Sequence, residues 1–317
     1  MLTQLLVAGA LLTLAPVQDT DTTFAVDPSE RLSVSNFSGV ITVRTWSRNE
    51  VRISAEHSRR DGIVVERSSG GILVRARSWE RWAHEFDVDV TEDDVHVEYA
   101  MPRTPSIVEY EITVPASMPL ELGGPFTDVV VEGAGGQVTV KIGEGDVEVV
   151  GGRGRVTVRV MEGDVTLQGA SGEIQVVSVD GEVSLEDCSG NVKVETTDGD
   201  IRMSNVRSAN IEALSVDGDV WFGGPLAPQG LYTFNTHDGD VTVFIPRGSS
   251  ARVTVATFDG DFYTDFAVTL PDRMRGRHVS FTLGDGGAQM EIDAFDGDIE
   301  LRYLEPGSSL EDAEQNR

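Results

Sequence analysis

The sequence has little of several residue types, and each shortage narrows the class of protein. It has one cysteine, Cys188, so neither an internal disulfide framework nor a multi-cysteine zinc site can form. It has only two lysines, Lys141 and Lys193, and 25 Lys+Arg stand against 53 Asp+Glu, a formal net charge of −28. Nucleic-acid binding needs basic clusters that neutralise phosphates, so the sequence predicts no nucleic-acid partner. The apolar content of 39% is too high for a wholly disordered acidic chain.

Long hydrophobic runs are also scarce. Residues 2–16, LTQLLVAGALLTLAP, have the length of a secretory h-region and are short for a membrane span. We expect residues 1–17 to be a signal peptide, although no basic residue precedes Arg31; a buried first strand or a misassigned start is the alternative. Elsewhere no run approaches eighteen apolar residues. The sequence therefore predicts an exported protein, periplasmic, on the cell surface or secreted, with no membrane span in the mature chain.

What the sequence does contain is a glycine repeat with a period of nine residues. The glycines in register are Gly136, Gly145, Gly154, Gly163, Gly172, Gly181, Gly190 and Gly199. The residue two positions after each is β-branched, and the residue four positions after each is apolar. Positions two apart on a strand point to the same face, so each unit is a short strand with two inward residues, closed by a turn. Such strands bury a core only by stacking, which predicts a solenoid.

Acidic residues flank alternate glycines, which indicates that two units make one coil. We predict an all-β fold, a single-stranded parallel β-helix (β-solenoid) with coils of roughly 18–21 residues; a three-strand coil is the alternative. The acidic corners continue beyond the strict repeat, with steps that lengthen to 19, 21, 21 and 37 residues. We expect a less regular N-terminal β region or cap over residues 24–120, the solenoid over 121–304 and a disordered tail over 305–317.

Three stretches carry a resemblance to a known family: VEYEITVP at 108–115, the repeated G-[DE]-V-x-[VL] units, and FTLGDGGAQMEIDAFDGDIELR at 281–302. Together they resemble the bacterial putative-adhesin family of β-helical domains of unknown function, over roughly residues 34–303. The resemblance implies an exported envelope or surface protein with no catalytic residues to carry over. Some relatives sit beside envelope-stress signalling systems, which implies a sensor or regulatory module as an alternative.

The acidic corners are the first candidate site. In a stack, equivalent residues lie about 4.8 Å apart, so the corner acids form two rows. The row before the glycine is Glu144, Glu162, Asp180, Asp198, Asp217, Asp238, Asp259 and Asp296, and the row after it is Asp146, Asp164, Glu182, Asp200, Asp219, Asp240, Asp261 and Asp298. Calcium could bridge such carboxylates, and the candidate ligands are Asp198, Asp200, Asp217, Asp219, Asp238 and Asp240. Two alternatives need no metal: turn chemistry of Asp beside Gly, and an acidic composition set by habitat or genome.

Aromatic residues give a second candidate site. Trp221 and Tyr263 occupy an outward position two acidic corners apart, so we expect them roughly 10 Å apart on one exposed face, where they could bind a surface glycan or an envelope protein. The alternative is that loops or tail residues cover them. Trp79, Trp82 and Phe86 form another cluster, which we interpret as a cap on the first coil.

No catalytic motif is present: the sequence has no G-x-S-x-G elbow, P-loop or H-E-x-x-H. Parallel β-helices do host carbohydrate-active enzymes, but fold analogy supplies no activity. We therefore predict a non-catalytic binding or adhesion protein without a cofactor, followed by the sensor module, with a carbohydrate-active enzyme third.

Overall fold

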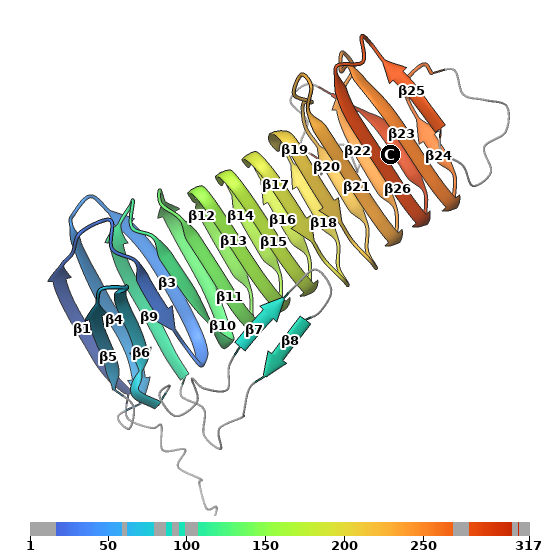
Figure 1. Cartoon of the computed structure of the whole chain (residues 1–317). Helices are drawn as coiled ribbons and strands as arrows, with labels where there is room; N and C mark the ends of the chain where they lie inside the picture. Colours follow the sequence, from blue (N-terminus) through green and yellow to red (C-terminus); the bar gives the residue numbers. More distant parts are fainter. Residues whose placement is uncertain are drawn as a thin grey trace, which may run out of the picture.

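The computed structural model describes residues 17–58, 62–78, 87–90, 95–98, 107–268, 279–305 and 310. Within these ranges the chain is all-β and mostly parallel. Twenty-five strands belong to one large sheet, and β7 (Asp87–Val90) and β8 (Val95–Glu98) form a separate antiparallel pair. Figure 1 shows the large sheet as an elongated stack, with the N-terminal strands at one end and β23–β25 at the other. Trp79, Trp82 and Phe86, which the sequence suggests as a cap, lie outside the described residues.

The large sheet consists of two ladders of strands that share β10 (Leu120–Ala134). The start of β10 pairs with β2 and β11, and its end pairs with β3 and β12. On the N-terminal side of β10 the first ladder contains, in spatial order, β5 (Ile63–Ser68), β6 (Gly71–Ala76) and β2 (Leu32–Ser35). On the other side it contains β11 (Val138–Glu144), β13 (Arg153–Glu162), β15 (Ser171–Asp180), β17 (Ser189–Glu195), β19 (Arg207–Leu214), β21 (Leu231–Asp238), β26 (Ala288–Asp296), β23 (Ala251–Asp259) and β25 (Val279–Leu283).

The second ladder runs parallel to the first along the stack. On the N-terminal side of β10 it contains, in spatial order, β1 (Val17–Ala25), β4 (Glu50–Ser58), β9 (Ile107–Pro115) and β3 (Ser38–Trp46). On the other side it contains β12 (Val147–Gly151), β14 (Val165–Gln168), β16 (Val183–Glu186), β18 (Ile201–Ser204), β20 (Val220–Gly223), β22 (Val241–Pro246), β27 (Ile299–Leu304) and β24 (Phe262–Thr264). We call a first-ladder strand together with the second-ladder strand that follows it across the acidic corner a rung.

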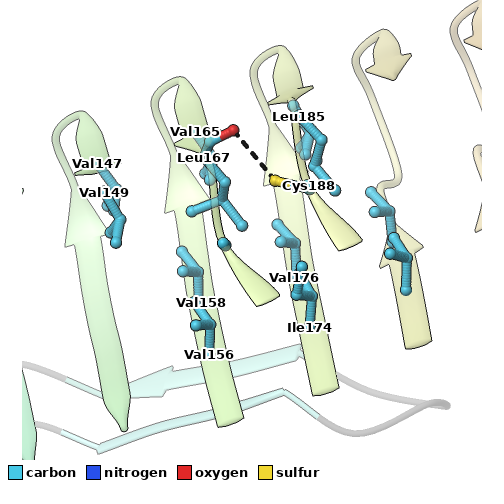
Figure 2. Packing of buried hydrophobic residues seen from close by; sticks show 14 of the residues in the cluster. Val147, Val149, Val156, Val158, Val165, Leu167, Ile174, Val176, Leu185 and Cys188 are labelled. Carbon is cyan, nitrogen blue, oxygen red and sulfur yellow. Dashed lines mark hydrogen bonds between the residues drawn. The ribbon is translucent and has the colours of Figure 1, made fainter. Parts of the chain in front are cut away.

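The pairing register follows the sequence repeat. Val138 pairs with Val156 and Val156 with Ile174, so partners on neighbouring rungs are 18 residues apart. Both strands of a rung bury their alternate residues: Val156 and Val158 of β13 and Val165 and Leu167 of β14 are fully enclosed. Figure 2 shows these inward side chains aligned from rung to rung. Because the inward positions are those that the repeat marks as apolar, one continuous core extends along the whole stack.

The rungs near the C-terminal end are not in sequence order. Tyr232 of β21 pairs with Met290 of β26, and Met290 pairs on its other side with Val253 of β23. The rung β26–β27 therefore lies between β21–β22 and β23–β24, and the expected succession of corners at Asp238, Asp259 and Asp296 is wrong. In the sequence the chain forms β23, β24 and β25 before it forms β26 and β27.

Antiparallel strands finish the stack at both ends. β1 pairs antiparallel with β4 and β5 with β6 at one end, and β25 pairs antiparallel with β23 at the other. At the N-terminal edge Arg52 of β4 donates to both carboxylate oxygens of Asp21 on β1, at 3.1 and 2.7 Å. An open parallel edge invites pairing with another chain, and these reversed strands cover it over part of each end.

Candidate functional site

The acidic corners lie in register along one edge of the stack, where each rung passes from the first ladder to the second. Bridges join Asp180 to Asp198, Asp198 to Asp217 and Asp217 to Asp238. The row then continues through Asp296 to Asp259. The structure thus brings the first-row acids together as one line, with its last two members exchanged relative to the sequence.

The second-row acids hold the rungs together. Asp146 Oδ1 accepts the backbone N–H of Asp164 at 3.0 Å, and Asp164 Oδ1 accepts that of Glu182 at 2.9 Å. The pattern resumes beyond Glu182, where Asp200 accepts the N–H of Asp219 at 2.9 Å. The backbone N–H groups of Asp240, Asp298 and Asp261 then donate to the carboxylates of Asp219, Asp240 and Asp298, respectively. Each carboxylate satisfies a backbone donor that the corner would otherwise leave without a partner. These acids therefore have a structural role.

The glycine between the two rows is required by the close approach of neighbouring corners. Gly181 has a φ of +124°, and a Cβ there would lie 2.3 Å from the carbonyl oxygen of Gly163. Any side chain would push two rungs apart, which explains why the repeat keeps glycine at this position.

The calcium candidates are placed by this arrangement. Asp198, Asp217 and Asp238 belong to the exposed first row, whereas Asp200, Asp219 and Asp240 belong to the hydrogen-bonded second row. Across the part of the chain that the structure describes, no group of three or more His, Cys, Asp or Glu side chains is arranged to hold a metal ion. Calcium requires six to eight oxygen ligands, so a straight line of single carboxylates is a poor site for it.

Trp221 does not lie on an exposed face. It is 9% exposed and packs against Phe244 and Leu310, so the expectation of an exposed tryptophan is wrong. The guanidinium of Arg202, on the neighbouring rung, stacks over its ring at 4.0 Å from the centroid. Leu310 belongs to the segment that the sequence predicts to be a disordered tail, and this leucine covers the indole from outside.

Tyr263 is exposed, but it is farther from Trp221 than expected. Because of the exchanged rungs, Thr242 and Glu300 both stand between them in the row, so the two are three rungs, or about 14 Å, apart. The neighbouring carboxylates of Asp261 and Asp298 raise the pKa of the Tyr263 hydroxyl. The structure does not unite these two aromatic residues in one surface.

A different aromatic group lies on the corner edge, immediately before the first-row acids. The rings of Phe258 and Phe295 stack with centroids 4.9 Å apart and an interplanar angle of 4°, and His237 stacks on Phe295 at 4.7 Å and 20°. Phe258 is 68% exposed and Phe295 is 49% exposed. Val216, one rung farther in, is also exposed. We call His237, Phe295 and Phe258 the corner stack.

Sequence reasoning missed the corner stack, although a signal for it is present. The tetrapeptide F-D-G-D occurs at 258–261 and again at 295–298, and H-D-G-D and V-D-G-D stand at 237–240 and 216–219. Read along the sequence, the two phenylalanines are 37 residues apart. Only the exchange of rungs makes them neighbours.

Two buried groups have shifted titration. Burial raises the pKa of the Cys188 thiol, whose Sγ contacts the carbonyl oxygens of Glu186 at 3.4 Å and Leu167 at 3.5 Å. Burial also raises the pKa of Tyr232. Both side chains belong to the continuous core, where a thiol is inert.

Comparison with known families identifies the chain. Residues 9–302 match the family described as Toastrack DUF4097, and the protein belongs to this family, the putative-adhesin family of unknown function that the sequence resembles. The comparison with curated proteins found no match.

Several solved structures are similar to this chain over most of its length, with low sequence identity. A "putative adhesin" from Parabacteroides merdae has 10% identity and a TM-score of 0.37, over 90% of this chain and 96% of that one. A "putative lipid binding protein" from Parabacteroides distasonis has 8% identity and a TM-score of 0.39, over 90% and 97%. A "putative cell adhesion protein" from Clostridium sporogenes has 11% identity and a TM-score of 0.22, over 90% and 100%.

Among the described residues, no helix has the length and the apolar character that crossing a bilayer requires.

Proposed function

We propose that this chain is an exported, non-catalytic β-solenoid of the adhesin type that binds a partner through the corner stack. The observation that carries the proposal is the exposure of two stacked phenylalanines beside a row of carboxylates. Exposed aromatic side chains that form a contiguous group are unfavourable in water and typical of binding surfaces.

The chemistry of the corner stack favours a protein partner with basic and apolar side chains. The rings of Phe258 and Phe295 cover the faces that they turn to each other, so within the stack their edges point toward solvent. A sugar ring needs an open aromatic face. Lysine and arginine side chains can lay their apolar stems on the ring edges and reach Asp259 and Asp296 with their charged groups.

The acidic corners support a binding role over an enzymatic one. The second-row carboxylates accept backbone hydrogen bonds from the next rung, which makes them structural groups. A regulatory module that senses another envelope protein would use the same exposed surface, so it remains the second proposal. The surface glycan is the alternative partner.

The test compares binding of two synthetic peptides by fluorescence anisotropy. One alternates lysine with leucine, and the other replaces every lysine by glutamate. We expect the basic peptide alone to bind, with F258A/F295A weakening it at least tenfold. The variant I107A/L231A is the matched control, because it also removes two exposed apolar side chains. Ile107 lies in β9, near the N-terminal end of the stack, and Leu231 begins β21, at the other end of that strand from His237. Equal binding by both double variants, or binding of the glutamate peptide, would contradict the proposal.

Export is tested separately by mass spectrometry of the protein recovered from cell fractions. A mature N-terminus near residue 17 in the envelope or medium is the expected result. Recovery of the uncleaved chain from the cytoplasm would contradict the exported location, and it would leave the peptide-binding result unaffected.

A further inference from the structure

An open groove of about 400 Å³ lies on the outer face of the first ladder, over β11 and β13. Its lining is basic, which is unusual in a chain with twice as many acidic as basic residues. Arg31, Lys141, Arg155 and Arg159 line it, against Glu121 and Glu173. In Figure 1 these strands stand in the green, middle part of the stack, well separated from the rungs of the corner stack.

Two of the four basic residues already have acidic partners. Arg155 forms an ion pair with Glu173 at 2.8 Å, and Arg31 forms one with Glu121 at 3.5 Å. These carboxylates belong to the groove itself, so their charge and that of their arginines offset each other. The remaining pair is Lys141 and Arg159.

Lys141 and Arg159 are direct register partners on adjacent parallel strands. Their neighbours in the same row of the ladder are Gly123 on one side and Val177 on the other, so no acid stands next to either within that row. Among the described residues neither has an ion-pair partner, and Nε of Arg159 is buried without a hydrogen-bond partner. Like charges placed side by side on a sheet are destabilising unless something offsets them.

We propose that this groove binds the anionic group of a small acidic sugar, with Lys141 and Arg159 as its ligands. A guanidinium presents paired donors that match a carboxylate or a phosphate, and the ammonium of lysine adds a second charge. The hydroxyls of Thr139 and Thr157 and the amides of Gln137 and Gln175 line the same groove and can hydrogen-bond sugar hydroxyls.

The surroundings decide between possible sources of the anion. The groove is mostly polar, with Pro119 and Leu120 as its apolar lining residues, so it offers little surface for an acyl chain. The net charge of −28 repels a long polyanion. A short anion is affected mainly by the charges near the groove, because salt at physiological ionic strength screens charges farther away than about 8 Å. A short acidic saccharide fits both conditions. This inference does not depend on the function proposed for the corner stack.

Isothermal titration calorimetry at low salt tests the groove, with trigalacturonate as the carboxylate probe and glucose 6-phosphate as the phosphate probe. We expect at least one of them to bind the wild-type protein and neutral galactotriose not to bind. K141Q/R159Q should weaken binding at least tenfold. K193Q/R247Q is the matched control, because it also removes one lysine and one arginine charge, but from residues that are ion-paired with Glu195 and Glu305. It should bind the probe within twofold of wild type.

A second readout separates binding from folding. The bound probe should raise the Tm of the wild-type protein and of F258A/F295A, and it should leave the Tm of K141Q/R159Q unchanged, since a ligand stabilises only a protein that it binds. Absence of binding by both acidic probes, or an equal loss in the two charge variants, would overturn the proposal. Binding to phosphatidylglycerol vesicles without binding to either sugar would also overturn it, in favour of a lipid surface.

Discussion

The carboxylate of Asp240 accepts the backbone N–H of Asp298 at 2.8 Å, although the two residues are 58 positions apart in the sequence. The same contact joins residues 18 apart in the regular rungs. The corner hydrogen bond is therefore a property of adjacent rungs in space, and it is formed equally well by a rung that the chain has inserted out of order.

The first prediction concerns this hydrogen bond. Asp240→Ala removes the acceptor for a corner N–H, and we expect it to lower the free energy of unfolding by about 1–2 kcal/mol. Asp240→Asn keeps an oxygen acceptor and should lose less. Asp238→Ala is the matched control, since Asp238 belongs to the exposed first row; it should be neutral or slightly stabilising because it relieves repulsion along the row. Urea denaturation measures all three. An equal loss in D238A and D240A would show that the two rows do not differ in role.

The second prediction separates steric clash from backbone strain at the corner glycine. Gly181→Ala should destabilise the fold by about 3 kcal/mol or more, because its Cβ would meet the Gly163 carbonyl oxygen at 2.3 Å. Gly169 also has a positive φ, +67°, but open space surrounds its Cβ position, so Gly169→Ala should cost only the strain, about 1 kcal/mol. Chemical denaturation of the two variants gives the comparison. Similar losses would mean that the close approach of rungs is not what requires glycine.

The third prediction is a pH dependence that arises at Tyr232. Its buried hydroxyl donates to the Ser208 carbonyl oxygen and accepts from the Ala227 N–H, both at 2.7 Å, and burial raises its pKa. A raised pKa means that the folded state holds the proton more tightly than the unfolded chain, in which the tyrosine has a pKa of about 10. The stability from this group is therefore present below pH 10 and lost as the pH rises through the pKa of the folded state.

The measurement for Tyr232 is the urea midpoint at pH 8 and at pH 10.8. Wild type should lose more stability between these values than Tyr232→Phe, which has no hydroxyl to ionise. At pH 8 the variant should itself be about 1 kcal/mol less stable, because the Ser208 carbonyl loses its donor. The same pH dependence in both proteins would assign the loss to other groups.

The fourth prediction addresses the acidic corners and calcium. Because the second row is engaged with backbone donors, we expect millimolar calcium after chelation to shift the Tm no more than magnesium at the same concentration, through general screening of the acidic rows. Thermal unfolding of residues 18–317 with each ion is the measurement. A calcium-specific rise that D198N/D217N abolishes would instead establish a metal site in the first row.

Much of this fold follows from the sequence alone. The period of nine, the β-branched residues after each glycine and the acids around alternate glycines together predict parallel strands, their inward faces and the alignment of the corners. These features are local, and each repeat carries them, so Val156 and Val165 face the core for reasons that a short stretch of sequence already contains.

The tertiary structure alone decided which rungs are neighbours and what covers their outer faces. The corners at Asp238, Asp259 and Asp296 are chemically equivalent, so no local pattern tells which pair adjoins. That choice brings Phe258 against Phe295, moves Tyr263 away from Trp221, and lets Leu310 bury the indole. The Lys141–Arg159 pair likewise depends on which residues flank it across the ladder. Contacts between distant segments depend on the path of the whole chain, which a repeat of nine residues does not specify.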